Sequence, residues 1–478
     1  SPDTDRYELG KEFPRIAEIQ LAADLESGRV LATVQLGDGG QFSHYLRELD
    51  GQWRRFSRFG DGIVQATFGE EESLLIVSRA GAPRGKLLRL SPERLDIGQA
   101  ATVIPEGDET IVTNFWGSPT VVSAGSRIYL LYQQGGPTRL RVFDRQGESL
   151  PAPRQLPVSS VSTPIDLGDG EILFRNESYV DPPAYYRYDP RAGTTVRTAL
   201  ATDSPVDFAG VTVRREFARS KDGTRVPLNL LLPPGAGPDQ PHACVVTGYG
   251  GYGISLVPRY RPVRTVLLDQ GVLYVVANLR GGGEFGETWH REGNLTRKQN
   301  VFDDFYAVLK HLVARGYTTP NKLAIIGGSN GGLLMGATMT QHPGAIRAVV
   351  SMVGIYDMLR VEQSPNGAFN IPEFGTVQHP DQFRALLAYS PYHHVREGAE
   401  YPATLMLTGA NDPRVDPMQS RKMAARLQAA NASDQPILLR TSRQTGHGSG
   451  TPLAARIEET VDIYAFLLDR LEVTRISH

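Results

Sequence analysis

The sequence has little cysteine and lacks any long apolar run. Its 478 residues include a single cysteine, Cys244, within the apolar stretch 243–246. No intramolecular disulfide can form, and we expect a small buried side chain there. No stretch is long enough to span a bilayer, and the N-terminal residues SPDTDRYELGKEF contain no apolar signal core. We therefore expect a soluble protein. A cytoplasmic location is favoured, while a periplasmic or secreted one stays open, since the sequence would not show a leader that once preceded Ser1.

The chain also lacks an excess of either charge. Lys plus Arg number 50 and Asp plus Glu number 52, which gives a formal net charge of -2. This balance argues against nucleic acid or an acidic membrane as the partner. Hydrophobic residues make up 40% and charged residues 21%, as in ordinary soluble proteins. Because 478 residues exceed what one core usually reaches, we expect two domains.

The N-terminal part reads as short strands separated by turns, in about four repeats. The first strands of the repeats start 44, 54 and 44 residues apart. They cover residues 29–34, 73–77, 127–131 and 171–174, and their following strands cover 44–49, 86–90, 140–143 and 184–188. This period is typical of β-propeller blades. A β-sandwich is the alternative.

Beyond Phe217 the pattern changes to apolar strands that alternate with helical segments. The strands cover residues 243–246, 272–277, 323–326, 348–352 and 403–407, and the helices cover 302–314, 418–429 and 454–471. Such alternation predicts an open α/β sheet. The boundary lies near residues 202–211, so we expect an all-β domain over 1–205 and an α/β domain over 206–478.

The stretch KLAIIGGSNGGLL, residues 322–334, is the first candidate for chemistry. A short apolar strand, a glycine-dense turn with Ser329 at its apex and a following helix are the setting of a nucleophile elbow. The flanking glycines suit a strained turn, where a neighbouring side chain would collide with the strand or the helix. Taken alone, a serine between glycines is more often an ordinary turn residue.

Two later strands end beside suitable partners for Ser329. Asp412 follows strand 403–407, and His447 follows an apolar run at 437–441. The order serine, acid, histidine is that of α/β-hydrolases. His447 would take the hydroxyl proton while Asp412 holds the imidazole. Each residue alone could be a turn former or a surface loop residue, but the three positions together favour catalysis.

An oxyanion site needs hydrogen-bond donors near Ser329. One candidate is the backbone N–H of Asn330, the residue after the nucleophile. The other is the Tyr249 hydroxyl, in the glycine-rich segment GYGGYG at 248–253. A tight turn with packed aromatics is the alternative for that segment.

Of two other motifs, the first favours a structural role and the second favours a loop near the active site. The pair His393-His394 lacks the spacing and companions of a metal site. Gly281-Gly282-Gly283 lacks the lysine-serine pair of a phosphate loop and any dinucleotide fingerprint. No cofactor and no metal are implied.

Several motifs now give the chain a family resemblance. GYGGYG at 248–253, NLRGGGEFG at 278–286, KQNVFDDF at 298–305, GGSNGGLL at 327–334 and YSPYHH at 389–394 resemble the prolyl oligopeptidase family of serine peptidases. The similarity runs over residues 216–471. It implies an α/β-hydrolase catalytic domain capped by a seven-bladed propeller that limits access to short peptides.

The resemblance also assigns residues by position. It implies the triad Ser329, Asp412 and His447, with Tyr249 at the oxyanion. Arg414 matches the arginine that binds substrate carbonyls, and the proline pocket would be lined by Tyr252, Ile355, Phe374 and Val415. Asn370 stands where the family has a tryptophan that stacks on proline. Since an amide offers little stacking area, we expect a weaker proline preference.

A second departure from the family lies at the N-terminal end, where only about four blades precede the catalytic domain.

The leading hypothesis is a serine oligopeptidase that cleaves short peptides after proline through an acyl-enzyme. A broader-specificity oligopeptidase or an acylaminoacyl-type peptidase is the runner-up. A propeller-based binding protein with an inactive hydrolase domain is a distant alternative, and an esterase is disfavoured. A monomer is favoured, although the sequence does not fix the oligomeric state.

Overall fold

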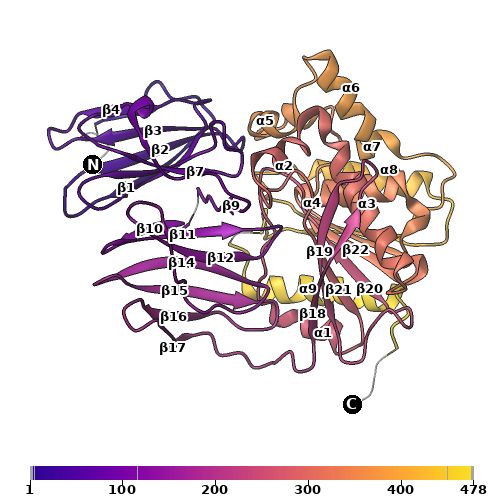
Figure 1. The fold of residues 1–478 in the computed structure, drawn as a ribbon. Helices are drawn as coiled ribbons and strands as arrows, with labels where there is room; N and C mark the ends of the chain where they lie inside the picture. The colour runs from indigo at the N-terminus through magenta and orange to yellow at the C-terminus, as the bar shows by residue number, and fades with distance from the viewer. Residues whose placement is uncertain (1–3, 5, 116, 449, 475–478) are drawn as a thin grey trace. The chain divides into compact units, whose positions relative to one another are not determined.

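The computed structural model describes residue 4 and residues 6–115, 117–448 and 450–474 (Figure 1). The chain divides into two compact units. The first contains residues 1–177, 183–201 and 285–288, and the second contains residues 178–182, 202–284 and 289–478.

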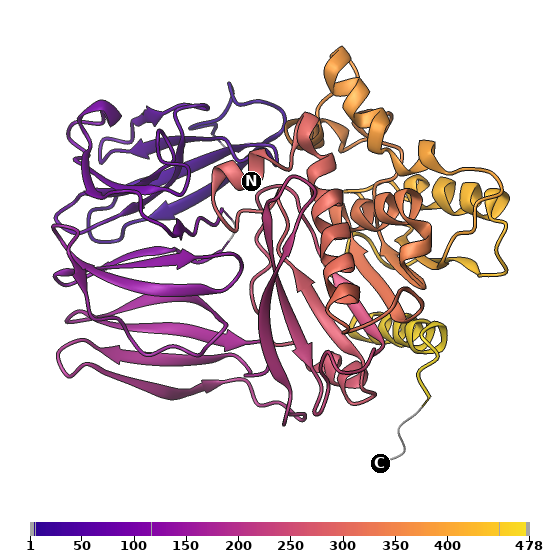
Figure 2. The ribbon, with the colours of Figure 1, turned by 45° about the vertical axis from the view of Figure 1, so that its right-hand side comes forward.

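Four antiparallel sheets make up the first unit in the described part of the chain, and they follow one another in sequence (Figure 2). The first sheet holds β1 (Ala17–Ala23), β2 (Val30–Leu36), β3 (Phe42–Arg47) and β4 (Trp53–Ser57), and the second holds β5 (Ile63–Phe68), β6 (Leu74–Ser78), β7 (Lys86–Leu90) and β8 (Ala101–Ile104). The third holds β9 (Thr110–Ile111), β10 (Val121–Ala124), β11 (Arg127–Gln133), β12 (Thr138–Asp144) and β13 (Ser149–Leu150), and the fourth holds β14 (Ser159–Gly168), β15 (Glu171–Ser178), β16 (Ala184–Asp189) and β17 (Thr194–Ala201).

Apolar clusters join each sheet to the next. Leu46 and Leu74 belong to a cluster shared by the first two sheets, and Leu130 belongs to one shared by the second and third. The sequence correctly locates the two inner strands of every sheet, because these carry the buried residues. It misses the outer strands, such as β1 and β17, whose residues are largely exposed.

The second unit is built on one eight-stranded sheet. Its order is β18-β19-β21-β20-β22-β23-β24-β25. The strands are β18 (Thr212–Arg219), β19 (Arg225–Leu232), β20 (Cys244–Thr247), β21 (Leu273–Ala277), β22 (Leu323–Gly328), β23 (Ala348–Met352), β24 (Ala403–Gly409) and β25 (Ile437–Ser442). β18 and β19 pair antiparallel, β19 is antiparallel to β21, and the pairs from β21 to β25 are parallel.

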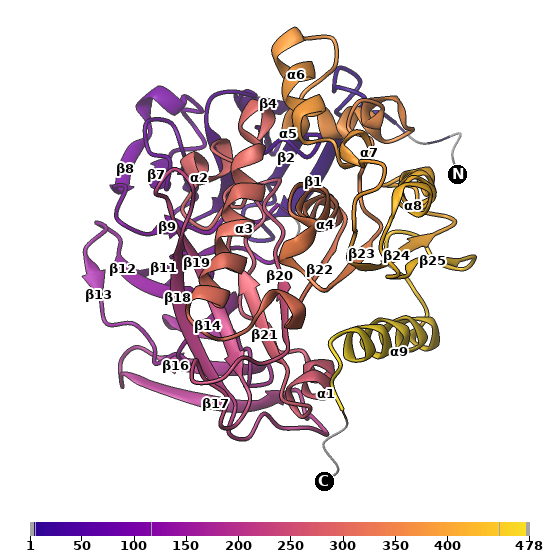
Figure 3. The same cartoon turned by 90° about the vertical axis from the view of Figure 1, so that its right-hand side faces the viewer.

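Helices cover both faces of this sheet (Figure 3). The helices are α1 (Thr265–Leu268), α2 (Glu287–Arg291), α3 (Gln299–Ala314), α4 (Asn330–Gln341), α5 (Ile371–Phe374), α6 (Pro380–Tyr389), α7 (Pro391–His394), α8 (Met418–Ala430) and α9 (Leu453–Arg470). Phe305 of α3, Leu334 of α4 and Met423 of α8 pack on one face. Leu267 of α1 and Leu467 of α9 pack on the other. The open α/β sheet expected from the sequence is therefore present, and Cys244 is buried within it.

None of the described helices combines the length and the apolar character that crossing a membrane requires.

Candidate active site

The carboxyl ends of neighbouring parallel strands bring the predicted residues to one edge of the sheet. Ser329 directly follows β22, Asp412 lies in the loop after β24, and His447 lies in the loop after β25. The segment that contains Tyr249 follows β20, which pairs with β22. In open α/β sheets, this edge is where ligands bind.

Ser329 occupies a strained turn. Its backbone has φ 58° and ψ -121°, a conformation that a side-chain-bearing residue rarely adopts. The turn needs its glycines, because a Cβ on Gly327 would lie 2.5 Å from the Gly331 carbonyl oxygen, and one on Gly332 would lie 2.5 Å from the Gly354 Cα. The serine thus stands at the junction of β22 and α4 as an elbow requires.

A continuous hydrogen-bond chain joins the three predicted triad residues. His447 Nε2 lies 3.0 Å from Ser329 Oγ, and His447 Nδ1 lies 2.7 Å from Asp412 Oδ2. Burial alone would raise the pKa of Asp412, but the hydrogen bonds from His447 and the Val415 backbone N–H outweigh it and lower that pKa. The aspartate is therefore held as a carboxylate facing the imidazole.

The Tyr249 segment lies against the start of α4. Asn330 donates its side-chain amide to the Tyr249 carbonyl, and a Cβ on Gly331 would lie 3.6 Å from the Tyr249 ring. As the first residue of α4, Asn330 has a backbone N–H without an acceptor in its own helix. The structure therefore brings the Asn330 backbone N–H and the segment that contains Tyr249 next to the serine turn.

The predicted apolar pocket residues are part of the large core on one face of the sheet or pack against it. Ile355, Phe374 and Val415 belong to it, and Tyr252 packs against it. The Tyr252 ring meets the Phe374 ring edge-on at 5.6 Å between centroids. Asn370 is 6% exposed and accepts a hydrogen bond of 2.8 Å from the Tyr252 hydroxyl. The amide that replaces the expected tryptophan is thus fixed against Tyr252 by a polar contact.

Arg414 follows Asp412 by two residues, and its backbone N–H donates to Asp412 Oδ1 at 2.8 Å. The backbone N–H of Val415 donates to the same oxygen at 2.9 Å. This turn joins Arg414 and Val415 to Asp412, the predicted triad acid.

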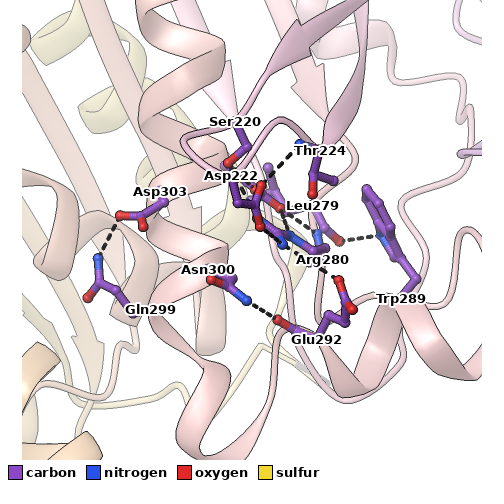
Figure 4. Close-up of polar contacts among 11 residues, drawn as sticks. Ser220, Asp222, Thr224, Leu279, Arg280, Trp289, Glu292, Gln299, Asn300 and Asp303 are labelled. Atoms are coloured by element: carbon purple, nitrogen blue, oxygen red, sulfur yellow. Dashed lines mark hydrogen bonds and ion pairs between the residues drawn. The ribbon is translucent and has the colours of Figure 1, made fainter.

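The sequence missed a buried ionic cluster beneath the loop that follows β21 (Figure 4). Arg280 is 1% exposed and Asp304 is fully buried. The Arg280 Nε lies 2.9 Å from Asp304 Oδ2, and its guanidinium also meets Asp222 and Glu292. The cluster fixes Arg280 and therefore the next residue, Gly281. The Gly281 carbonyl accepts a hydrogen bond of 3.0 Å from the backbone N–H of Gly253, which lies in the same segment as Tyr249. The motifs NLRGGGEFG and KQNVFDDF contain Arg280 and Asp304, but their wide separation gives no local sign of the pairing.

The histidine pair predicted to be structural makes local contacts. His393 Nδ1 lies 2.8 Å from Ser390 Oγ, and His394 Nδ1 lies 3.0 Å from the Ser390 carbonyl oxygen. Among residues 4, 6–115, 117–448 and 450–474, no group of three or more His, Cys, Asp or Glu side chains could hold a metal ion.

Comparison with known families matches both parts of the chain. The sequence model described as Prolyl oligopeptidase family matches residues 258–474. The one described as Prolyl oligopeptidase, N-terminal beta-propeller domain, matches residues 35–199. The predicted fold class, an α/β-hydrolase domain preceded by propeller blades, is thereby confirmed.

Individual relatives agree with these matches. The prolyl endopeptidase of Elizabethkingia meningoseptica is 30% identical over 422 residues, which are 87% of this chain and 58% of the relative. Protease 2 of Moraxella lacunata is 28% identical over 418 residues, which are 86% of this chain and 59% of the relative. This chain thus spans less than two thirds of the length of either relative.

One solved structure covers nearly all of the chain. It comes from a structural and mechanistic analysis of two prolyl endopeptidases, is 32% identical and has a TM-score of 0.91. The match covers 99% of this chain and 69% of that one. Because both sequence models and this solved structure point to the same family, the chain belongs to the prolyl oligopeptidase family.

Proposed function

We propose that this chain is a serine oligopeptidase that hydrolyses short peptides on the carboxyl side of proline. The observation that carries the proposal is the hydrogen-bond chain from Ser329 through His447 to Asp412, with Ser329 on a strained turn. Membership of the prolyl oligopeptidase family supports the same reaction.

In the proposed reaction, His447 Nε2 takes the Ser329 hydroxyl proton as the oxygen attacks the peptide carbonyl carbon. The resulting oxyanion receives hydrogen bonds from the Asn330 backbone N–H and the Tyr249 hydroxyl. His447 then gives the proton to the departing amine, which leaves an acyl-enzyme. His447 then takes a proton from water as the water oxygen attacks the acyl carbon, and it returns that proton to Ser329 Oγ as the acid product leaves. Asp412 holds the imidazole tautomer and stabilises its cation throughout.

Substrate binding would use the neighbouring residues. The Arg414 guanidinium, a planar donor, suits the carbonyl oxygens of a peptide. Tyr252, Ile355, Phe374 and Val415 would supply apolar surface for a proline ring, and the rings of Tyr252 and Phe374 are in contact. These features support a proline preference but do not demand it.

A broader-specificity oligopeptidase is the second candidate, and Asn370 favours it. Its side chain offers little stacking surface to a proline ring and accepts a hydrogen bond from the Tyr252 hydroxyl. An acylaminoacyl-type peptidase shares this reasoning. A binding protein with an inactive hydrolase domain is disfavoured by the intact hydrogen-bond chain.

The test is a cleavage-site profile on a mixed peptide library, read by mass spectrometry, with Ser329→Ala as the matched control. Cleavage mainly after proline supports the proposal, and cleavage after many residue types supports the broader candidate. Equal cleavage by wild type and Ser329→Ala would refute both.

A further inference from the structure

Three buried titratable side chains lie behind the oxyanion segment and the pocket. Lys298, directly before α3, has a fully buried side chain, and Glu373 of α5 is 1% exposed. Lys298 Nζ lies 2.7 Å from Glu373 Oε1, and His290 Nε2 of α2 lies 2.9 Å from Glu373 Oε2. We call Lys298, Glu373 and His290 the buried clamp. Both carboxylate oxygens of Glu373 are therefore engaged within it.

One end of the buried clamp holds the backbone next to Tyr249. Lys298 Nζ also donates to the Gly250 carbonyl oxygen at 2.9 Å. Gly250 has φ 62°, and a Cβ there would lie 2.3 Å from Val301 and 3.0 Å from the Arg280 carbonyl oxygen. The backbone at Gly250 is thus closely surrounded, and the buried Lys298 ammonium fixes the direction of the Gly250 carbonyl.

The other end of the buried clamp touches the pocket. Glu373 immediately precedes Phe374, whose ring centroid lies 5.2 Å from Lys298 Nζ. The Phe374 ring in turn meets Tyr252, which follows Gly250 by two residues. A single ammonium therefore contacts both segments that would surround the reacting peptide bond.

Burying the charged groups of the buried clamp costs more free energy than a purely structural contact requires. Taking two charges out of water requires a large desolvation free energy, and apolar residues of similar volume often give equal stability. Burial alone would raise the pKa of Glu373, but Lys298 and His290 outweigh it and lower that pKa to about 2. Glu373 is thus a carboxylate at neutral pH and directs Lys298 toward the Gly250 carbonyl.

We propose that Lys298, held by Glu373 and His290, is a positioning residue that sets the direction of the Tyr249 hydroxyl toward the oxyanion by fixing the Gly250 carbonyl. Lys298 contacts no reacting atom in this scheme and acts through the carbonyl of Gly250, the residue after Tyr249. The inference rests on the peptidase function proposed above.

The test is a double-mutant cycle of Lys298→Met with Tyr249→Phe, measured as kcat/KM on a blocked glycyl-prolyl p-nitroanilide. Loss of one oxyanion donor lowers turnover by about 100-fold or more. In the wild-type background we expect Tyr249→Phe to cost about that factor. In the Lys298→Met background we expect it to cost less than about tenfold, because residues that act through one another are not additive.

The matched control is Lys322→Met. Lys322 is exposed and donates to the Pro241 carbonyl oxygen at 3.2 Å, so Tyr249→Phe should cost the full factor in that background. Should Lys298→Met fail to fold by circular dichroism, the cycle is measured with Glu373→Gln, which removes the carboxylate that directs Lys298.

If Tyr249→Phe lowers kcat/KM by the same factor with and without the intact buried clamp, the inference is overturned. Failure of the proposed function would look different. It would appear as absent turnover in the wild type, or as turnover that Ser329→Ala does not abolish.

Discussion

Breaking the ion pair between Arg280 and Asp304 should destabilise the second unit strongly. Asp304 accepts hydrogen bonds from Arg280 Nε at 2.9 Å, Arg280 Nη2 at 2.6 Å, the Arg280 backbone N–H at 3.2 Å and Ser220 Oγ at 2.5 Å. Arg280→Met removes the two guanidinium bonds and leaves a buried carboxylate without its cation. Such a loss costs about 3–5 kcal/mol. Because Ser220 and the backbone N–H remain, we expect about 3 kcal/mol.

Thermal unfolding followed by circular dichroism measures this cost. For a unit of this size, about 3 kcal/mol corresponds to a fall in Tm of about 5 °C. Burial already raises the pKa of Asp304, although Arg280 opposes it. Without Arg280 that pKa rises further, so the folded variant binds more protons than its unfolded chain. The difference in free energy of unfolding between wild type and Arg280→Met should therefore become smaller as the pH falls from the raised pKa of Asp304 toward the ordinary value of 3.8.

A second variant and a control make the prediction specific. Arg280→Met with Asp304→Asn removes the stranded charge and should recover at least about 1 kcal/mol of the loss. Arg384→Met breaks a pair with Asp381 whose side chains are 68% and 84% exposed, so it should cost no more than about 1 kcal/mol. The reasoning fails if Arg280→Met costs less than the exposed control, or if the double variant is no more stable than the single.

Three further predictions concern the site and the buried clamp. Asp412→Asn should lower kcat by about 10⁴-fold, because His447 would lose the acceptor that fixes its tautomer; a loss below tenfold in a p-nitroanilide assay would contradict this. Asn370→Trp should raise kcat/KM on prolyl relative to alanyl p-nitroanilides by about 2- to 10-fold, the worth of one aromatic contact; an unchanged ratio counts against it. The pKa of Glu373 is lowered from 4.5 to about 2 in the folded protein. The ionised carboxylate therefore adds about 3 kcal/mol to the free energy of unfolding above pH 4.5, and this contribution is lost as the pH falls toward 2. The free energy of unfolding, measured with urea, should therefore change less between pH 2 and 4.5 in Glu373→Gln than in wild type. An equal change with pH in the two proteins would refute this prediction.

The sequence predicted that Ser329, Asp412 and His447 meet because simple rules govern where residues at strand ends lie. Ser329, Asp412 and His447 each follow a strand, and parallel strands deliver their carboxyl ends to one edge. The apolar runs also located the inner strands of each antiparallel sheet. Outer strands such as β17 were missed because their residues alternate weakly and are mostly exposed.

Contacts between distant segments could not be predicted. Tyr252 and Asn370 are 118 residues apart, and Lys298 and Glu373 are 75 residues apart. No local pattern marks which carboxylate a lysine will meet when loops from several strands converge. The motif around Lys298 was recognisable, but the bond from Lys298 to the Gly250 carbonyl depends on the folded positions of β20 and α3.

The most direct test of the account asks whether Ser329 is the nucleophile. The protein is treated with an organophosphonate that carries a reporter group, digested and analysed by mass spectrometry, while peptide hydrolysis is followed in parallel. We predict an adduct on the peptide that contains Ser329, loss of hydrolysis in proportion to labelling, and neither labelling nor hydrolysis in Ser329→Ala. An adduct on another residue, or hydrolysis that survives in Ser329→Ala, would contradict the account.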